Sequence, residues 1–293
     1  MTARRALPVN TVLPATLAML AFAANSLLCR FALRETALDA ASFTTIRLLS
    51  GAVVLWLLVL SRSARGGGGT LPNRGNWPSA LALFAYAAAF SFAYLQLTAA
   101  TGALVLFGAV QVTMIGVGLR RGERFRTIQL LGFAMALAGL VALLLPGLSA
   151  PPLAAALLMT GAGVAWGVYS LLGARAADPL GDTAGNFLRA APCAVVLSVL
   201  MIDRIQFDTT GTWLAIASGA LASGLGYAVW YAVLPRLPAL RASVLQLSVP
   251  VVTAAGGVLL LGEPLGLRLL LCSAAVLGGV LLVVATRTAQ SLK

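Results

Sequence analysis

The sequence predicts an all-α integral membrane protein with ten transmembrane helices, arranged as two inverted repeats of five helices each. Three observations predict this fold: an apolar composition, the spacing of the charged residues, and an internal similarity between the two halves. Of the 293 residues, 60% are apolar and 10% are charged, and the mean hydropathy is +0.97. A soluble protein of this length needs more charge on its surface, and the strand alternation typical of a membrane β-barrel is absent from the sequence.

Charged residues occur in short segments and leave apolar runs between them. The runs are about 18 to 22 residues long, which is the length of helix that spans the ~30 Å hydrocarbon layer of a bilayer. The first run follows Arg4 and Arg5 but is too long for a signal peptide, so we expect it to be a membrane helix. The ten predicted spans are 10–31, 42–61, 77–97, 102–120, 127–145, 152–174, 183–201, 213–235, 240–261 and 267–286.

The distribution of Lys and Arg predicts the orientation. With the N-terminus in the cytoplasm, fourteen basic residues fall in cytoplasmic segments, and only Arg34, Arg204 and Arg268 fall on the opposite side. Because basic residues favour the cytoplasmic side, we expect both termini to lie inside, in a bacterial inner membrane. The net charge of +12 then indicates contact with anionic lipid. The basic residues form no continuous basic face, so nucleic acid is not an expected partner.

The two halves of the chain resemble each other at an offset of 140 positions. Val112-Thr113 aligns with Val252-Thr253, and Gly122-Glu123 aligns with Gly262-Glu263. We therefore expect a single membrane domain with repeat one over 1–147 and repeat two over 148–293. Since five spans is an odd number, the second repeat enters the membrane from the opposite side. Inverted repeats of this kind support alternating access.

The segment from Gly226 to Leu237, together with Ala242-Ser243, Pro250-Val251 and Gly262-Glu263, resembles the signature of EamA-type transporters. These transporters belong to the drug/metabolite transporter superfamily. The resemblance covers essentially the whole chain, and the segment from Gly102 to Gln111 is most similar to the bacterial aromatic amino-acid exporters.

The resemblance implies a secondary transporter with a central cavity, with the first four helices of each repeat around the cavity and the fifth helices peripheral. Two features depart from the family pattern. The usual Trp-Gly of the first helix is Phe22-Ala23, and the usual Pro of the fourth helix is replaced near Val110-Gln111, as in the aromatic exporters.

The chain offers little for catalysis. It contains no His, and its eight Asp and Glu residues all fall at the ends of predicted spans or in loops. The cysteines Cys29, Cys193 and Cys272 lie in different spans without metal-ligand spacing, and no Walker-type phosphate loop is present. We therefore expect no enzyme activity, no metal and no cofactor.

Polar residues inside the spans are the candidates for substrate binding. An arginine within the membrane costs about 2.5 to 3.5 kcal/mol on insertion scales unless it faces a cavity or reaches the interface. Arg47 and Arg189 occupy similar places in the second and seventh spans. Each could hold a substrate carboxylate, and each could equally be a structural anchor. The amides of Asn25, Gln111 and Gln246 could bind ammonium or carboxylate groups, or bond neighbouring helices.

Aromatic residues cluster at mid-depth, away from the headgroup level where Trp and Tyr usually lie. Their polar tips need hydrogen-bond partners that lipid does not supply, so they favour a cavity, with ordinary helix packing as the alternative. The candidates are Tyr86, Phe90 and Tyr94 in the third span, Trp166 and Tyr169 in the sixth, and Tyr227 and Trp230 in the eighth. Glu123 and Glu263 are expected to cap the helices 127–145 and 267–286.

The composition predicts a membrane protein, and the inverted repeat predicts a secondary transporter that works by alternating access. The resemblance implies that it exports amino acids, in particular aromatic ones. Because no carboxylate lies within a span, we expect the efflux to be downhill. The alternatives are an exporter of other hydrophobic metabolites or drugs, a carrier of sugar nucleotides or phosphorylated metabolites, and a scaffold or receptor without transport. A drug exporter of the small multidrug type relies on a membrane-embedded Glu, and a phosphometabolite carrier needs several cationic residues in its cavity.

Overall fold

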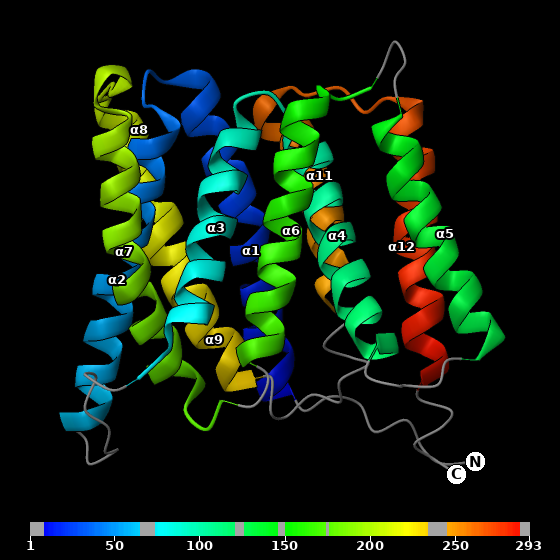
Figure 1. Cartoon of the computed structure of the whole chain (residues 1–293), viewed down its shortest axis with the longest axis horizontal. Coiled ribbons are helices and arrows are strands. Elements are labelled where there is room, and N and C mark those ends of the chain that lie inside the picture. Colours follow the sequence, from blue (N-terminus) through cyan, green and yellow to red (C-terminus); the bar gives the residue numbers. More distant parts are fainter. Residues whose placement is uncertain are drawn as a thin grey trace.

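The computed structural model describes residues 9–64, 74–120, 126–145, 150–173, 176–233 and 245–287. All regular secondary structure in these ranges is helical, and the helices run side by side (Figure 1). The elements are α1 (Val9–Glu35), α2 (Ala40–Ala64), α3 (Trp77–Tyr94), α4 (Ala99–Arg120), α5 (Thr127–Leu144), α6 (Leu153–Gly173), α7 (Pro179–Leu200), η2 (Ile202–Arg204), α8 (Thr209–Ala217), the π-helical segment η3 (Ser218–Leu225), α9 (Gly226–Val233), α11 (Ser248–Leu261) and α12 (Leu267–Arg287).

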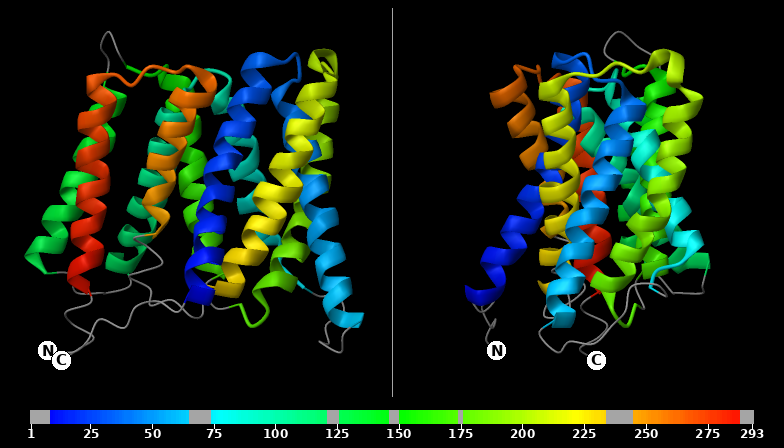
Figure 2. Two further views of the ribbon diagram at one scale, coloured as in Figure 1. Left: turned by 180° about the vertical axis from the view of Figure 1, so that it is seen from behind. Right: turned by 90° about the vertical axis from the view of Figure 1, so that its left-hand side faces the viewer.

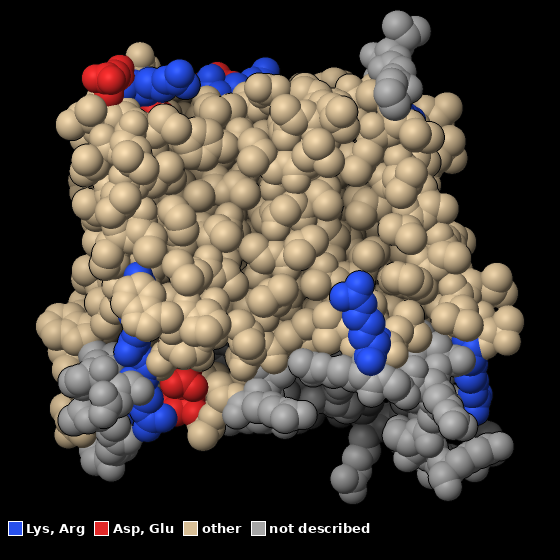
Figure 3. Space-filling model, viewed as in Figure 1, with Lys and Arg blue, Asp and Glu red and all other residues tan. Residues whose placement is uncertain are grey.

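Eight helices in the described part of the chain are long and apolar enough to cross a membrane. One of them is the continuous run of α8, η3 and α9. Over their described residues, Ser248–Leu261 and Leu267–Val283 are apolar but shorter. Many large apolar side chains face outward, such as Leu131, Leu259 and Leu271. Charged side chains gather near the upper and lower edges of the face shown in Figure 3, with a broad uncharged band between them. An apolar surface of this extent is typical of a multi-pass membrane protein.

Polar residues at the two ends of the bundle start several helices. A side-chain oxygen of each capping residue accepts a hydrogen bond from a backbone N–H in the first turn, which stabilises a helix by about 1 kcal/mol. Asp39 caps α2, Asn76 caps α3, Asp178 caps α7 and Asp208 caps α8. The acidic residues and amides of these connections therefore define where the apolar helices begin.

The upper end of the bundle, as drawn in Figure 1, contains the connections α1–α2, α3–α4, α7–α8 and α11–α12. The lower end contains the residues that precede α3 and α7. The pair α5 and α12 packs side by side at one edge, as both Figures 1 and 2 show. This position agrees with the expectation that the fifth helix of each predicted repeat is peripheral.

Glycines bring the backbones of α5 and α12 into contact. A Cβ atom at Gly132 would lie 2.6 Å from the carbonyl oxygen of Gly279, and one at Gly139 would lie 2.8 Å from the Cβ of Ala275. Small residues of this kind allow helices in a membrane to approach closely, where dispersion contacts replace the hydrophobic effect. Gly139 and Gly279, which align between the two halves, thus both lie in the α5–α12 contact.

We predict that Gly132→Ala destabilises the protein by about 1–3 kcal/mol, because the added methyl group has no space between the two backbones. Gly161→Ala is the matched control, since nothing lies within 4 Å of a Cβ at that position on α6. Thermal unfolding in detergent measures both variants. Equal melting temperatures for Gly132→Ala and Gly161→Ala would show that the α5–α12 contact is looser than described.

Candidate substrate cavity

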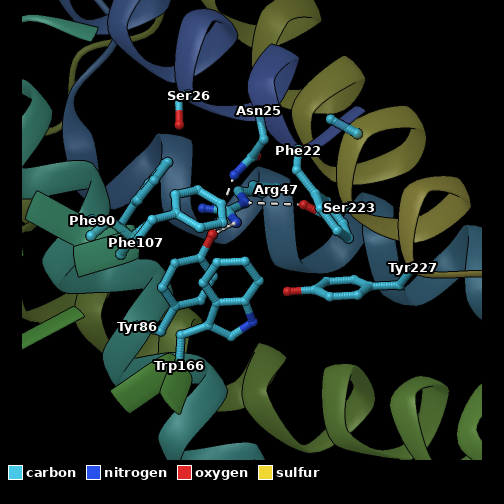
Figure 4. Close-up of a pocket in the computed structure, with 12 residues that line it drawn as sticks. Phe22, Asn25, Ser26, Arg47, Tyr86, Phe90, Phe107, Trp166, Ser223 and Tyr227 are labelled. Atoms are coloured by element: carbon cyan, nitrogen blue, oxygen red, sulfur yellow. Dashed lines mark hydrogen bonds between the residues drawn. The ribbon is translucent and has the colours of Figure 1, made fainter. Parts of the chain in front are cut away.

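A small cavity lies inside the bundle, away from the α5–α12 pair. Its volume is about 10 Å³, which is enough for roughly one water molecule. The close-up in Figure 4 shows rings and polar tips converging on this space. The lining residues come from α1, α2, α3, α4, α6, η3 and α9, and they are Phe22, Asn25, Ser26, Arg47, Tyr86, Phe90, Leu106, Phe107, Trp166, Ala222, Ser223 and Tyr227.

Arg47 is the charged residue of this cavity. Its side chain extends from α2, and the residue is only 2% exposed. The guanidinium donates a hydrogen bond from Nη2 to the Tyr86 hydroxyl at 2.8 Å and a longer one from Nε to Ser223 Oγ at 3.4 Å. Its carbon lies 5.1 Å from the ring centre of Tyr86 and 4.9 Å from that of Phe90, which is cation–π distance. The remaining nitrogen, Nη1, is buried without a hydrogen-bond partner.

Asn25 and Tyr86 extend the polar network from Arg47 to α1 and η3. The Asn25 amide donates from Nδ2 to the Tyr86 hydroxyl at 3.3 Å, and its Oδ1 accepts from the Ser218 hydroxyl at 2.7 Å. Both residues are almost fully buried. Buried polar groups of this kind are expensive unless they are bonded, so the network fixes the positions of the side chains around the cavity.

Aromatic rings form most of the rest of the lining. The rings of Tyr86 and Trp166 are stacked with centroids 5.5 Å apart, and Phe107 meets Trp166 edge to face at 5.2 Å. Phe22 packs against Trp166 at 6.1 Å and against Tyr227 at 5.6 Å. A space bounded by rings on several sides suits a flat apolar group.

The π-helical segment η3 places Ser223 in the cavity lining and Ser218 against Asn25. In a π-helix the backbone bonds join residues five apart, so Ser218 and Ser223 lie one turn apart on the same side. Ser218 bonds to Asn25, and Ser223 accepts from Arg47. Gly219, between them, faces the backbone carbonyl of Arg47, where a Cβ would overlap it. The close approach of α2 and η3 therefore depends on this glycine.

Arg47 and Arg189 occupy similar places in the sequence but have different surroundings in the structure. Arg47 lines the cavity, whereas Arg189 on α7 donates to the backbone carbonyls of Arg74 and Gly185 near the lower end. Half of the candidate residues, namely Asn25, Arg47, Tyr86, Phe90, Trp166 and Tyr227, come together around the cavity. The others lie outside its lining.

Those other candidates have different surroundings. Tyr94 is fully buried behind Phe90 and donates from its hydroxyl to the carbonyl of Ala99 at 3.3 Å. Trp230 packs on the Phe22 ring at 6.1 Å. Gln111 and Tyr169 are buried in α4 and α6, and Gln246 is half-buried just before α11.

Sequence reasoning missed several lining residues. The sequence marks Phe22 only as a departure from the family pattern, and no sequence pattern points to Ser26, Leu106, Phe107 or Ala222. A signal was available for the serines, since Ser218 and Ser223 are hydroxyl residues inside an apolar span. Their five-residue spacing does not match an α-helix, so it gave no reason to place them together.

The expectation that Glu263 caps α12 is wrong. The carboxylate lies instead at the start of α4, where Oε2 accepts from the backbone N–H of Ala99 at 2.7 Å. Its Oε1 accepts from Arg30 Nε at 2.9 Å, and Arg30 also donates to the carbonyl of Tyr94 at 2.8 Å. The chain takes this path because Gly262 ends α11 in a left-handed conformation, with φ of 61°. Glu123, its counterpart in the first repeat, lies outside the described residues.

Glu263 therefore joins α1, α3, α4 and the α11–α12 connection at the upper end. The residue is 3% exposed, so the pair with Arg30 is shielded from solvent and from salt. A pair in such surroundings interacts more strongly than a surface pair, although taking both charges out of water offsets much of the gain.

A second ion pair closes the lower end. Arg62 at the end of α2 forms a double hydrogen bond with the Asp178 carboxylate, with Nη1 at 2.8 Å from Oδ1. Arg74 lies 3.8 Å from the same carboxylate. Nearby, Asp182 and Asn186 accept hydrogen bonds from the backbone N–H groups of Gly75 and Asn76. These contacts tie the end of α2 and the start of α3 to the start of α7.

Hydrogen bonds from Arg62 are the largest cause of a lowered pKa for Asp178. Partial burial acts in the opposite direction, and the backbone N–H of Gly181 lowers the pKa further. No group of three or more His, Cys, Asp or Glu side chains that could hold a metal ion occurs within the described ranges.

Comparison with known proteins places this geometry in context. The model of a family described as the EamA-like transporter family matches residues 153–285, which lie within the second predicted repeat. An uncharacterized protein of Pseudomonas aeruginosa is 56% identical over 282 residues, covering 96% of this chain and 97% of that one. A crystal structure of a protein with 21% identity matches with a TM-score of 0.66, over 94% of this chain and 98% of that one. The last comparison supports the fold alone.

We predict that Glu263→Gln lowers the free energy of unfolding by about 3 kcal/mol, because it leaves the buried charge of Arg30 without its carboxylate. Glu35, paired with the exposed Arg34, provides the control. Glu35→Gln leaves the Glu263 carboxylate and its 3.7 Å contact with Arg34 in place, and it should change stability by at most about 1 kcal/mol. A double-mutant cycle with Arg30→Gln, read by thermal unfolding in detergent, isolates the coupling. Additive effects of the two single substitutions would contradict a direct pair.

A second prediction concerns the pH dependence of the Arg62–Asp178 pair. Because the folded protein holds the pKa of Asp178 below its unfolded value, the pair stabilises the protein above about pH 4. That contribution is lost as the pH falls through the folded pKa. Asp178→Asn keeps a capping oxygen but removes the charge, so its melting temperature should fall less steeply than that of the wild type below about pH 4. Parallel curves for the two proteins would contradict the pKa shift.

Proposed function

We propose that this chain, which belongs to the EamA-like transporter family, is a secondary transporter that exports amino acids with aromatic side chains. The family is one of membrane transporters of small molecules. The substrate, the direction and the mechanism are our proposals. They combine the sequence patterns with the geometry of the cavity.

The observation that carries the proposal is the buried guanidinium of Arg47. It is almost fully removed from solvent, its Nη1 has no hydrogen-bond partner, and no Asp or Glu is among the residues that line the described cavity. A buried positive charge is costly without a partner of opposite charge. We infer that the missing partner is the carboxylate of the substrate, since an arginine binds carboxylates through paired hydrogen bonds.

The rings around Arg47 account for an aromatic side chain in the substrate. Phe22, Phe107, Trp166 and Tyr227 line the same cavity as Arg47, as Figure 4 shows. Offset-stacked and edge-to-face ring contacts stabilise aromatic pairs beyond their buried area, by about 0.5–1.5 kcal/mol each. A phenylalanine or tryptophan side chain could replace the ring contacts that these residues now make with one another.

The cavity volume of about 10 Å³ is too small for an amino acid. Pockets that hold drug-sized ligands measure about 300–1,000 Å³, so binding requires the helices to separate. The ion pairs Arg30–Glu263 and Arg62–Asp178 lie at opposite ends of the bundle. In the proposed mechanism, one end opens while the other stays closed. Two inverted repeats of five helices, over 1–147 and 148–293, would provide the two equivalent states.

The excess of Lys and Arg in the segments of the lower end supports a cytoplasmic position for that end and for both termini, in a bacterial inner membrane. Because no carboxylate lines the described cavity, no side chain there is suited to carry a proton with the substrate. Glu263 is buried, but it lies at the upper end in a pair with Arg30. We therefore propose downhill efflux.

The flux of L-phenylalanine and L-tryptophan in proteoliposomes tests the proposal, with glucose and a lipophilic cationic dye as comparison substrates. We expect flux of the two amino acids alone, without dependence on an imposed pH gradient. Flux of the dye in their place would favour a drug exporter. A steep dependence on the pH gradient would contradict downhill efflux.

We predict that Trp166→Ala lowers this flux by about tenfold or more, because it removes the ring that contacts Tyr86, Phe107 and Phe22. Trp56→Ala is the matched control, since Trp56 on α2 is 42% exposed on the outside of the bundle. Size-exclusion profiles in detergent report whether both variants are folded. A wild-type rate in Trp166→Ala would remove the cavity from the transport path.

A further inference from the structure

We propose that the cavity recognises the carboxylate and the ring of its substrate but not the ammonium group, so that aryl carboxylates without an amino group are also substrates. This inference rests on the proposed transport function and defines the substrate class of the same cavity. It follows from the hydrogen-bonding groups that surround Arg47.

The polar groups near Arg47 present hydrogen-bond donors to a ligand. Arg47 Nη1 is a donor without a partner. The Tyr86 hydroxyl oxygen already accepts from Arg47 Nη2 at 2.8 Å and from Asn25 Nδ2 at 3.3 Å. A phenolic oxygen has two acceptor positions, so the O–H hydrogen is the part of Tyr86 that remains available. Two donors on adjacent side chains are suited to a carboxylate.

The amide oxygen of Asn25 and the hydroxyl oxygen of Ser223 are neutral, and each already accepts one hydrogen bond. Asn25 Oδ1 accepts from the Ser218 hydroxyl at 2.7 Å, and Ser223 Oγ accepts from Arg47 Nε at 3.4 Å. The carboxylates that the structure describes lie at the ends of the bundle, such as Glu263 at the upper end and Asp178 at the lower end. A substrate ammonium in the cavity would therefore face the positive charge of Arg47 without a nearby negative charge.

Ring faces could in principle hold an ammonium group through cation–π contacts. The faces nearest to the polar network are occupied, however. The Arg47 guanidinium lies over Tyr86 and Phe90, and Tyr86 and Trp166 stack on each other at 5.5 Å. Of the other lining rings, Phe22 and Phe107 have no polar tips and suit the aryl group of a substrate, and Tyr227 packs against Phe22 at 5.6 Å.

The net charge of Arg47 together with a bound substrate leads to the same conclusion. A zwitterionic amino acid bound to Arg47 leaves one net positive charge in the cavity, whereas an aryl carboxylate bound to Arg47 leaves none. Enclosing a neutral pair costs less desolvation than enclosing a pair with an extra charge. An aryl carboxylate should thus bind at least as well as the amino acid of the same ring.

Competition for counterflow of labelled L-phenylalanine in proteoliposomes tests this inference. The competitors are 3-phenylpropionate, which has the carboxylate alone, and 2-phenylethylamine, which has the ammonium alone. We expect 3-phenylpropionate to inhibit within about threefold of the concentration of unlabelled phenylalanine that does so, and 2-phenylethylamine to require at least about tenfold more. Inhibition by 2-phenylethylamine alone, or equal inhibition by both, would overturn the inference.

Ligand-induced shifts of the melting temperature in detergent measure binding without transport, so they test the inference separately from the proposed function. If phenylalanine is not transported, the transport proposal fails, and the thermal shift still decides whether the cavity binds 3-phenylpropionate. We expect a shift with the wild type that Arg47→Gln abolishes. Arg189→Gln is the matched control and should keep the shift, because Arg189 bonds to backbone carbonyls outside the cavity. No shift with the wild type, or a full shift with Arg47→Gln, would overturn the inference.

Discussion

The arrangement of the bundle depends on a guanidinium that is enclosed among apolar helices without a carboxylate beside it. Arg47 is held by the Tyr86 hydroxyl, by Ser223 and by two aromatic faces. Other local features serve this position: η3 brings Ser223 within reach, and Gly219 allows η3 to approach the backbone of α2. These contacts reduce the cost of the buried charge, but they leave one nitrogen unsatisfied. A buried donor without a partner favours a ligand that accepts from it.

Each end of the bundle carries an ion pair, and the charge of Arg47 lies between the two ends. The Arg30–Glu263 pair joins the helices at the upper end, and the Arg62–Asp178 pair joins them at the lower end. Both pairs connect segments that are far apart in the sequence, so each can separate without unfolding a helix. The rings and the polar network fill the space between them. The bundle therefore has a small cavity between two ion pairs, and the proposed alternating access depends on these pairs separating in turn.

Composition and charge spacing were sufficient to predict an all-helical membrane protein, because the bilayer imposes helix length and hydropathy directly on the sequence. Which polar residues meet one another was harder to predict. Arg47 and Arg189 have similar sequence surroundings, yet the first points into the cavity and the second bonds to backbone carbonyls. The side chain that a helix presents to its neighbours depends on helix rotation, and in η3 on a change of helical period that the sequence does not signal. Glu263 was misassigned for a related reason: Gly262 turns the chain away from the helix that follows.

The central claim is that the carboxylate of the substrate is the missing partner of Arg47. A crystal or cryo-electron microscopy structure with bound L-phenylalanine tests this claim most directly. We expect a carboxylate oxygen about 2.7–2.9 Å from Arg47 Nη1, with the phenyl ring among Phe22, Phe107 and Trp166. A carboxylate bound elsewhere, with Arg47 Nη1 still unpartnered, would contradict it.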